Sequence, residues 1–231
     1  MSGKSVSRAD ADSGLPQYPT AQVTQCYHHW LVRLYCRIRF VILHQRFLRE
    51  IGQYLPPQGR VLDIGCGFGL FALCFASVRP GRTIYGIDLN ASRIEMARHA
   101  AAELGLENVA FDRIDATALR LDEPFDAAYL LDIVHHIPPD TVRPLLEQIH
   151  ARLDDAGGCL IIKDITTRPA YKRWFTWWLD KVMDYRTPVH YWPLDELHAL
   201  LEDIGFRVRV HEMLDYLPYP HVLYVCTKRP A

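Results

Sequence analysis

Hydrophobic and polar positions follow two patterns along this chain, a helical period near the N-terminus and short apolar runs after it. Between residues 22 and 53, apolar side chains recur at steps of three and four, with Arg33, Arg37 and His44 on the other side, which predicts one or two amphipathic helices. The apolar positions are Trp30, Leu31, Leu34, Tyr35, Ile38, Val41, Ile42 and Leu48. Before them, residues 1–20 are rich in Ser, Asp, Gly and Pro without periodicity, which predicts a flexible tail.

From residue 58 onward, short apolar runs alternate with longer helical patterns. Strands are predicted at 61–64, 83–88, 108–114, 125–131 and 159–165, and helices at 70–78, 92–104, 140–153 and 194–204. This alternation predicts an α/β protein with a doubly wound, mainly parallel sheet. Two further strands, 206–213 and 221–228, are joined by a Pro-rich turn with no room for a helix, so they must pair as antiparallel neighbours or lie apart.

Local signals predict where some of these helices begin and end. Ser92-x-x-Glu95 has the pattern of a capping box at a helix start, and Gly105 is expected to stop that helix. A later helix is expected to begin at Asp140 with Pro144 in its first turn, where a missing N–H is tolerated.

The segment 63–69, DIGCGFG, lies between a predicted strand and a predicted helix. Glycines there let the backbone turn sharply and approach a ligand closely. A strict dinucleotide-binding pattern would need a glycine where Leu70 stands, so this spacing is different. Asp88 ends the second strand, 19 residues beyond Gly69, where a carboxylate can accept hydrogen bonds from a ribose, and Asp115 follows the third strand, in a place to flank an adenine.

Together, VLDIGCGFG, GID ending at Asp88, Asp115 and FDAAYLLDIVHHI resemble class I S-adenosylmethionine-dependent methyltransferases, over about residues 58–227. HHIP after the fourth strand and GG before the fifth are similar to the small stand-alone group that methylates quinone, polyketide-type and lipid-like acceptors. The resemblance implies a Rossmann-like sheet of seven strands whose last strand is antiparallel, here preceded by the N-terminal amphipathic helices. It also implies S-adenosyl-L-methionine as the cofactor.

The resemblance carries specific roles to positions of this sequence. Gly65, Gly67 and Gly69 would contact the methionine part and Asp63 its amino group. Asp88 would contact the ribose. The complete set of expected cofactor-binding residues is Asp63, Gly65, Cys66, Gly67, Gly69, Asp88, Leu89, Asp115, Ala116 and Asp132. Cys66 lacks a basic neighbour, so no chemical role is expected for its thiol. The alternatives are a tight turn without a ligand for the loop and a solvated acid for Asp115.

A sulfonium methyl group is already activated, so its transfer mainly needs an acceptor held in line and water excluded, and no metal is expected. A hydroxyl or ring-carbon acceptor must also lose a proton. Asp132, His135 and His136 follow the fourth strand, where ligands of such sheets bind, and are the candidate catalytic residues. The alternative is that they only shape and orient the pocket. The pocket candidates are Asp164, Trp174, His190 and Tyr191.

Residues 168–193 form an insertion rich in aromatic and basic side chains. Three interpretations stay open: the insertion binds an apolar or aromatic acceptor, it packs the N-terminal helix onto the sheet, or it contacts a membrane surface peripherally through Trp and basic residues.

Composition limits the organisation and the partners. A chain of 231 residues with 49% hydrophobic and 23% charged residues suits one domain with a short appendage. We therefore expect a helical cap at 21–57 and a cofactor-binding domain at 58–231. The net charge of −1 argues against a nucleic-acid partner and favours a small molecule. Residues 1–60 hold eight basic and three acidic residues, a local charge of +5 that could dock on the acidic body or on an anionic membrane.

The six cysteines form no CxxC pair and have no clustered histidines at zinc-ligand spacing, so neither a metal site nor a disulfide framework is predicted. The N-terminus lacks the apolar core of a signal peptide, and no run approaches the ~20 apolar residues that span a bilayer. We expect a cytoplasmic protein with reduced thiols.

Other functions were weighed against methyl transfer. A nicotinamide-dependent reductase would carry a Tyr-x-x-x-Lys catalytic pair, and a non-catalytic binding module would keep the loop but fill the acceptor pocket. Methylation of a nucleic-acid base would call for an Asn/Asp-Pro-Pro-Tyr/Phe motif after the fourth strand, where Asp132 begins the sequence DIVH instead. The acceptor and the oligomeric state stay open.

Overall fold

The structure is a computed structural model that describes residues 16–120, 122–165, 190–212 and 221–229. Of the insertion predicted at 168–193, only residues 190–193 fall within these ranges. The candidate pocket residue Trp174 therefore lies outside the described residues.

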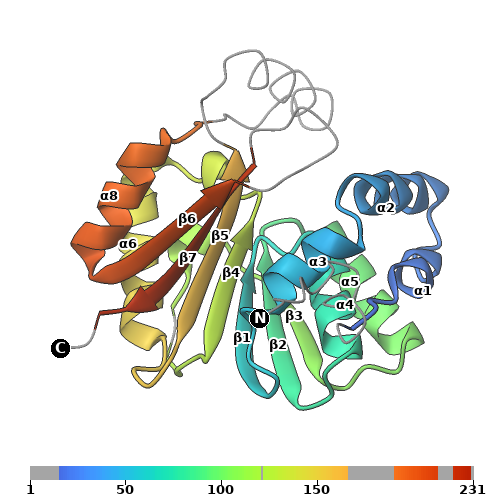
Figure 1. Cartoon of the computed structure of the whole chain (residues 1–231). Helices are drawn as coiled ribbons and strands as arrows, with labels where there is room; N and C mark the ends of the chain where they lie inside the picture. The colour runs from blue at the N-terminus through green and yellow to red at the C-terminus, as the bar shows by residue number, and fades with distance from the viewer. Residues whose placement is uncertain (1–15, 121, 166–189, 213–220, 230–231) are drawn as a thin grey trace, which may run out of the picture.

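A seven-stranded sheet forms the centre of the described part of the chain (Figure 1). Its strands are β1 Gly59–Ile64, β2 Arg82–Asp88, β3 Val109–Arg113, β4 Ala127–Leu131, β5 Cys159–Ile165, β6 Phe206–Glu212 and β7 His221–Lys228. They lie in the order β3-β2-β1-β4-β5-β7-β6. All pairs are parallel except β7, which is antiparallel to both β5 and β6. This confirms the predicted doubly wound sheet and the antiparallel pairing of its last two strands.

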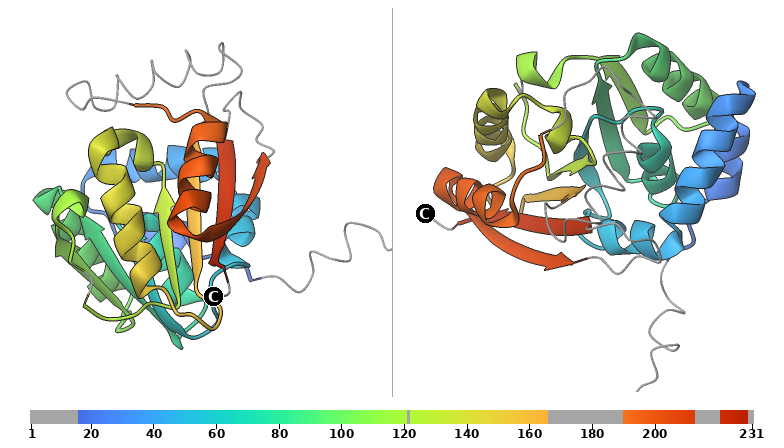
Figure 2. Two further views of the ribbon diagram at one scale, coloured as in Figure 1. Left: turned by 90° about the vertical axis from the view of Figure 1, so that its left-hand side faces the viewer. Right: turned by 90° about the horizontal axis from the view of Figure 1, so that it is seen from above.

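Helices cover both faces of the sheet (Figure 2). On one face, α4 Leu70–Ser77 and α5 Ala91–Glu103 connect the first three strands, and on the other lie α6 Pro139–Arg152 and α8 Leu194–Ile204. Each face has its own buried core, because alternate residues of each strand point to opposite sides. Two 3-10 turns, η1 Ala116–Ala118 and η2 Val134–His136, follow β3 and β4. A search of the described helices finds none with the length and apolar character needed to cross a membrane.

The N-terminal segment forms three short helices where one or two were expected. These are α1 Thr20–Gln25, α2 Trp30–Ile42 and α3 Gln45–Gly52, and they share their buried core with α4. Tyr18 is also buried, at 4% exposure, so packed structure begins before residue 20 and the predicted 1–20 tail is too long at its C-terminal end.

Most of the apolar stripe predicted along α2 does not face the core, although its residues Tyr35 and Ile42 pack against it. Five of its residues are exposed: Trp30, Leu31, Leu34, Ile38 and Val41. The opposite side of the helix is also apolar, with Cys36 fully buried and Val32 and Phe40 packed against the core. Since both sides are apolar, periodicity alone could not decide which one packs inward.

Two helix-start predictions are wrong. The cap of α5 is Asn90, whose side-chain oxygen accepts a hydrogen bond from the backbone N–H of Arg93 at 3.1 Å, so Ser92 lies inside the helix. Asn at this position caps as well as Ser does, which made the two signals compete. The α6 helix begins at Pro139, so Pro144 falls in the second turn. By contrast, Gly105 adopts a left-handed conformation just after α5, as predicted.

Candidate active site

The loop after β1 turns at three glycines with left-handed backbone: Gly65 (φ +75°), Gly67 (φ +56°) and Gly69 (φ +75°). A Cβ added to Gly65 would lie 2.5 Å from Cγ1 of Ile133, so this end of the loop is pressed against the segment after β4. A Cβ added to Gly67 would meet nothing within 4 Å. The loop is therefore closed on one side and open at Gly67, which makes it a cradle for a ligand.

Asp88, at the end of β2, faces this cradle and not bulk water. Its side chain is 8% exposed, and one carboxylate oxygen accepts the backbone N–H of Gly67 at 2.9 Å. The other oxygen accepts the N–H of Asn90, the cap of α5, at 2.8 Å. Each carboxylate oxygen can accept more than one hydrogen bond, so a ribose hydroxyl can still bind here.

Asp63, on β1, is buried beneath the same loop. The hydroxyl of Tyr129 on β4 donates a hydrogen bond of 2.9 Å to its carboxyl group. Burial raises the pKa of Asp63 to about 8, with the charge of Asp88 adding to the effect and the Tyr129 hydrogen bond opposing it. A buried carboxyl group of this kind favours a cationic partner such as an ammonium group.

The remaining predicted cofactor contacts differ in exposure. Leu89 is 62% exposed beside the cradle, whereas the side chain of Cys66 is buried, and burial raises the pKa of its thiol. Cys66 is therefore no nucleophile. Asp115 accepts hydrogen bonds from both the backbone N–H and the hydroxyl of Thr117, which starts the turn η1 at Ala116. The geometry therefore shows Asp115 as a capping residue. Its contact with an adenine stays a prediction.

Asp132, directly after β4, sits between two cations. Lys163 Nζ on β5 donates to one carboxylate oxygen at 2.5 Å, and Arg39 on α2 donates to the other at 2.5 Å. Lys163 is fully buried, and this burial lowers its pKa, while the charge of Asp132 acts in the opposite direction. Asp132 also has a left-handed backbone (φ +59°), which is unusual for a residue with a side chain. Because both of its oxygens are engaged by cations, Asp132 is better suited to orient Lys163 and Arg39 than to accept a proton.

His135 and Asp164 form a buried pair close to this cluster. Nδ1 of His135 is hydrogen-bonded to Asp164 Oδ1, and the backbone N–H of His135 donates to the other Asp164 oxygen at 3.0 Å. The two residues are 2% and 5% exposed. The ring of Tyr191 stacks on His135 with 5.7 Å between centroids, and the ring of His136 lies 4.2 Å away.

The structure thus brings several predicted pocket residues together at one edge of the sheet. His190 joins them through its backbone N–H, which donates to the carbonyl of His135 at 2.8 Å. Ile133, which a Cβ on Gly65 would meet, is two residues before His135, so the segment that closes the glycine cradle also carries the histidine, and Asp164 reaches it from β5. A ligand site and a histidine–carboxylate pair therefore share one edge of the sheet.

Comparison with known proteins identifies the family of the chain. A family model described as "Methyltransferase domain" matches residues 27–211, which is most of the chain. The chain belongs to this methyltransferase-domain family. The resemblance predicted from the sequence, to the S-adenosylmethionine-dependent class, is thereby confirmed.

The curated relatives match part of the chain. "Ubiquinone biosynthesis O-methyltransferase" of Paracidovorax citrulli (strain AAC00-1) is 35% identical over 114 residues, 48% of this chain and 45% of that protein. "Indolepyruvate C-methyltransferase" of Streptomyces griseus is 41% identical over 91 residues, 37% of this chain and 27% of that protein. The chain thus spans less than half the length of these curated relatives.

Among solved structures, the DhpI–SAH complex superimposes with a TM-score of 0.60 and 20% sequence identity, covering 92% of this chain and 94% of that one. At this level of identity the similarity shows a shared fold and nothing more.

Three residues of the candidate site had no signal in the sequence. Arg39 and Lys163 pair with Asp132 across 93 and 31 residues of chain. The hydroxyl of Tyr27, in the link between α1 and α2, donates to the carbonyl of Phe68 in the glycine loop at 2.7 Å. Arg39 and Tyr27 both come from the N-terminal helices, so these helices complete the site, which the pattern of each segment alone could not reveal.

Proposed function

We propose that this methyltransferase moves the methyl group of S-adenosylmethionine to an oxygen or carbon atom of a small apolar or aromatic acceptor. The observation that carries the proposal is the contact between the open glycine cradle and the segment after β4, whose His135 is paired with the buried Asp164 of β5. A cofactor site and a proton acceptor are thereby held at one edge of the sheet, which is what methylation of a hydroxyl or an acidic carbon needs.

The residues present fit the cofactor. Gly67 leaves space for the methionine part, Asp63 offers a buried carboxyl group for its ammonium, and Asp88 offers lone pairs to the ribose. When bound, the cofactor supplies a methyl group that is already activated as part of a sulfonium. The remaining work of the chain is to orient the acceptor and to take up its proton.

His135 is the residue that we assign to the proton. We assign the proton of the neutral imidazole to Nδ1, beside Asp164, so that Nε2 carries the lone pair, and the negative charge of Asp164 would stabilise the imidazolium that forms. Asp132 acts as a positioning residue through Arg39 and Lys163. His136 and Tyr191 shape the surroundings of the imidazole by ring contacts.

The relatives support the class of acceptor. One is named for O-methylation in ubiquinone biosynthesis and another for C-methylation of indolepyruvate. The half-buried ring of Tyr191 stacks on His135, and that of half-buried Trp192 packs edge-on against His190, so aromatic surface lies near the proposed base. The test is a panel of hydroxylated aromatic, quinol and 2-oxo-acid acceptors incubated with S-adenosylmethionine and analysed by mass spectrometry. A gain of one methyl group supports the proposal, and a panel without any gain, using protein that binds the cofactor, contradicts the acceptor class.

The alternative of a nicotinamide-dependent reductase fits the geometry less well. The sequence has one Tyr-x-x-x-Lys spacing, Tyr224 to Lys228, and both residues lie on β7. Four residues of a strand span about 13 Å, and Lys228 is paired with Asp155 at 2.6 Å, so the two side chains cannot form a catalytic pair. Against the second alternative, a non-catalytic binding module, the acceptor edge keeps a histidine–carboxylate pair.

We also propose peripheral contact with an anionic membrane, now through α2. Its exposed apolar stripe from Trp30 to Val41 fits within about 100° of the helix circumference. The helix contains no acid and, besides the Arg39 that pairs with Asp132, two further arginines, Arg33 and Arg37. Such a surface suits an interface with anionic headgroups. Co-sedimentation with anionic vesicles tests it, with Leu34→Glu as the variant. Binding by the wild type that the variant loses is the expected result, and equal binding of both contradicts it.

The expected cytoplasmic location likewise stays a proposal, and the six free cysteines support it.

A further inference from the structure

A cluster of histidine and glutamate side chains lies between the N-terminal helices and α5, apart from the active-site pair. His28 comes from the link between α1 and α2, and His99 and Glu103 lie one turn apart on α5. Nε2 of His28 is 2.8 Å from Glu103 Oε1, and Nδ1 of His99 is 3.6 Å from the same oxygen. Donor atoms of the three side chains all lie within 4.8 Å of one another.

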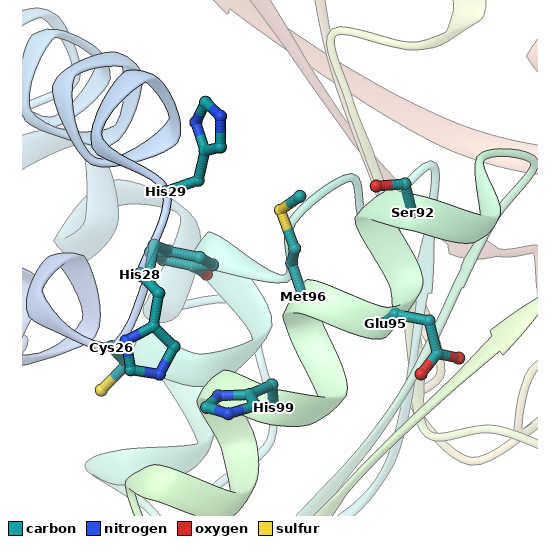
Figure 3. A pocket seen from close by; sticks show the side chains of 8 residues that line it. Cys26, His28, His29, Ser92, Glu95, Met96 and His99 are labelled. Carbon is teal, nitrogen blue, oxygen red and sulfur yellow. The ribbon is translucent and has the colours of Figure 1, made fainter.

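The side chains converge from two elements. In Figure 3 the imidazole of His28 points toward that of His99, whereas His29, next in the chain, points away. The two converging rings are 4.7 Å apart between centroids. They line a pocket of about 320 Å³ to which Cys26 and Met96 also contribute. His29 and Glu95 line the same pocket, whereas Glu103 meets His28 and His99 beside it.

This donor set has the chemistry of a transition-metal site. Two imidazoles and a carboxylate make up a known ligand set for Zn²⁺, with metal–ligand distances of about 2.0–2.2 Å. In a tetrahedral site of that size the ligand atoms lie about 3.3–3.6 Å apart, so the donors here need to move by only about 1 Å. The three side chains are 34–71% exposed, so an ion can reach them and they can adjust.

We propose that His28, His99 and Glu103 bind one divalent transition-metal ion, with Zn²⁺ the best match, and that this ion fastens the N-terminal helices to α5. The position gives the ion a role in the methyltransferase site. The first residues of α5 are tied to Asp88 through Asn90, and Tyr27, next to His28, is hydrogen-bonded to the glycine loop. An ion at this seam would hold both walls of the cofactor cradle.

The proposal reverses an expectation from the sequence, which predicted no metal site. That prediction rested on CxxC pairs and histidine clusters along the chain. His99 and Glu103 stand 71 and 75 positions after His28 in the sequence, and the local signal was only the His99-x-x-x-Glu103 spacing on one helix face.

Two features of the chain provide matched controls. His29 is an exposed histidine in the same link, and it points away from the cluster. His198 and Glu202 on α8 repeat the spacing of His99 and Glu103, with the same 3.6 Å between nitrogen and oxygen. Among the described residues, a third potential ligand joins His99 and Glu103, whereas none joins His198 and Glu202.

The experiment is a calorimetric titration of ZnCl₂ into the full chain, without an affinity tag and after chelator treatment. We expect one ion per chain in the wild type. His99→Ala and Glu103→Gln should each weaken binding at least ~10-fold, while His29→Ala and His198→Ala should bind as the wild type does. Zinc should also raise the melting temperature of the wild type and leave that of His99→Ala unchanged.

The outcomes separate cleanly. Absence of one-to-one binding, or binding that His99→Ala leaves unchanged, overturns the proposal. Weakening by His198→Ala as large as that by His99→Ala overturns it as well, because zinc would then bind any exposed histidine–glutamate pair. The altered side chains are exposed, so each variant should fold, and a melting curve in chelator checks this. The result does not depend on methyl transfer, because no cofactor or acceptor is present.

Discussion

Two regions of this molecule pair histidine with carboxylate, and they do so under opposite conditions. At the ends of β4 and β5, His135 and Asp164 meet in a site where both are 5% exposed or less. At the seam of α5 and the N-terminal helices, His28 and His99 meet Glu103 with imidazoles 71% and 54% exposed. The buried pair has fixed orientation and strong electrostatics, whereas the exposed cluster is screened by water and gains strength only if an ion joins it.

The largest effect is expected on catalysis at the buried pair. His135→Ala removes the proposed proton acceptor and should lower the rate of methyl transfer about 10²- to 10⁴-fold while leaving cofactor affinity near that of the wild type. His198→Ala on α8, outside both regions, is the control and should retain most of the activity. Rates are measured by mass gain of the acceptor. An unchanged rate in His135→Ala would show that His135 has only a structural role.

Stability should separate the two regions next. Asp164→Ala leaves a buried histidine without its carboxylate and should lower the free energy of unfolding by about 3–5 kcal/mol. Urea unfolding at neutral pH measures this loss. A loss below about 1 kcal/mol would mean that the pair is solvated in solution.

The cofactor cradle is a second buried region to probe. Asp88→Ala removes acceptors for the ribose and should weaken binding of S-adenosylhomocysteine about 10- to 100-fold, as expected for lost hydrogen bonds to a charged group. Calorimetry measures the affinity, with Glu202→Ala on α8 as the control. Since Asp88 also holds the loop, the variant's melting curve must show that it is folded. A folded variant with unchanged affinity would refute the ribose assignment.

Asp63 adds a pH dependence. Its pKa is about 8 in the folded chain against 3.8 for an ordinary Asp, so between these values the folded state holds a proton that the unfolded state has lost. The unfolding free energy of the wild type should therefore fall, relative to Asp63→Asn, as pH rises from about 4 to about 8. Urea unfolding across this range measures the difference. A difference that stays constant with pH would show that Asp63 is ionised in the folded protein.

The smallest effect is expected at the exposed cluster in the absence of metal. His99→Ala in chelator should change the free energy of unfolding by less than about 1 kcal/mol, because exposed ion pairs contribute little. Urea unfolding in chelator measures the change. A loss as large as that of Asp164→Ala would show that this cluster supports the fold without an ion, and the comparison between the two regions would fail.

What the sequence could predict follows from the range of the interactions involved. The strands and the glycine loop were predictable because alternation and turn residues act between near neighbours. Helix starts were less certain, since Asn90 and Ser92 can both cap and only the backbone decides. The orientation of α2 could not be predicted, because both of its sides are apolar.

The site residues that the sequence did not predict are those whose contacts join positions far apart in the chain. Asp88 and His135 were found because they end or follow predicted strands, whose carboxyl ends meet at one edge. Arg39, by contrast, reaches Asp132 from a helix 93 residues away, and His28 meets Glu103 across 75. Neither contact can be predicted from a local sequence pattern.

The most direct test of the central claim is a calorimetric titration of the wild-type chain with S-adenosylhomocysteine and, separately, with NADH. The account predicts one-to-one binding of S-adenosylhomocysteine and no measurable binding of NADH. Binding of NADH without binding of S-adenosylhomocysteine would contradict it.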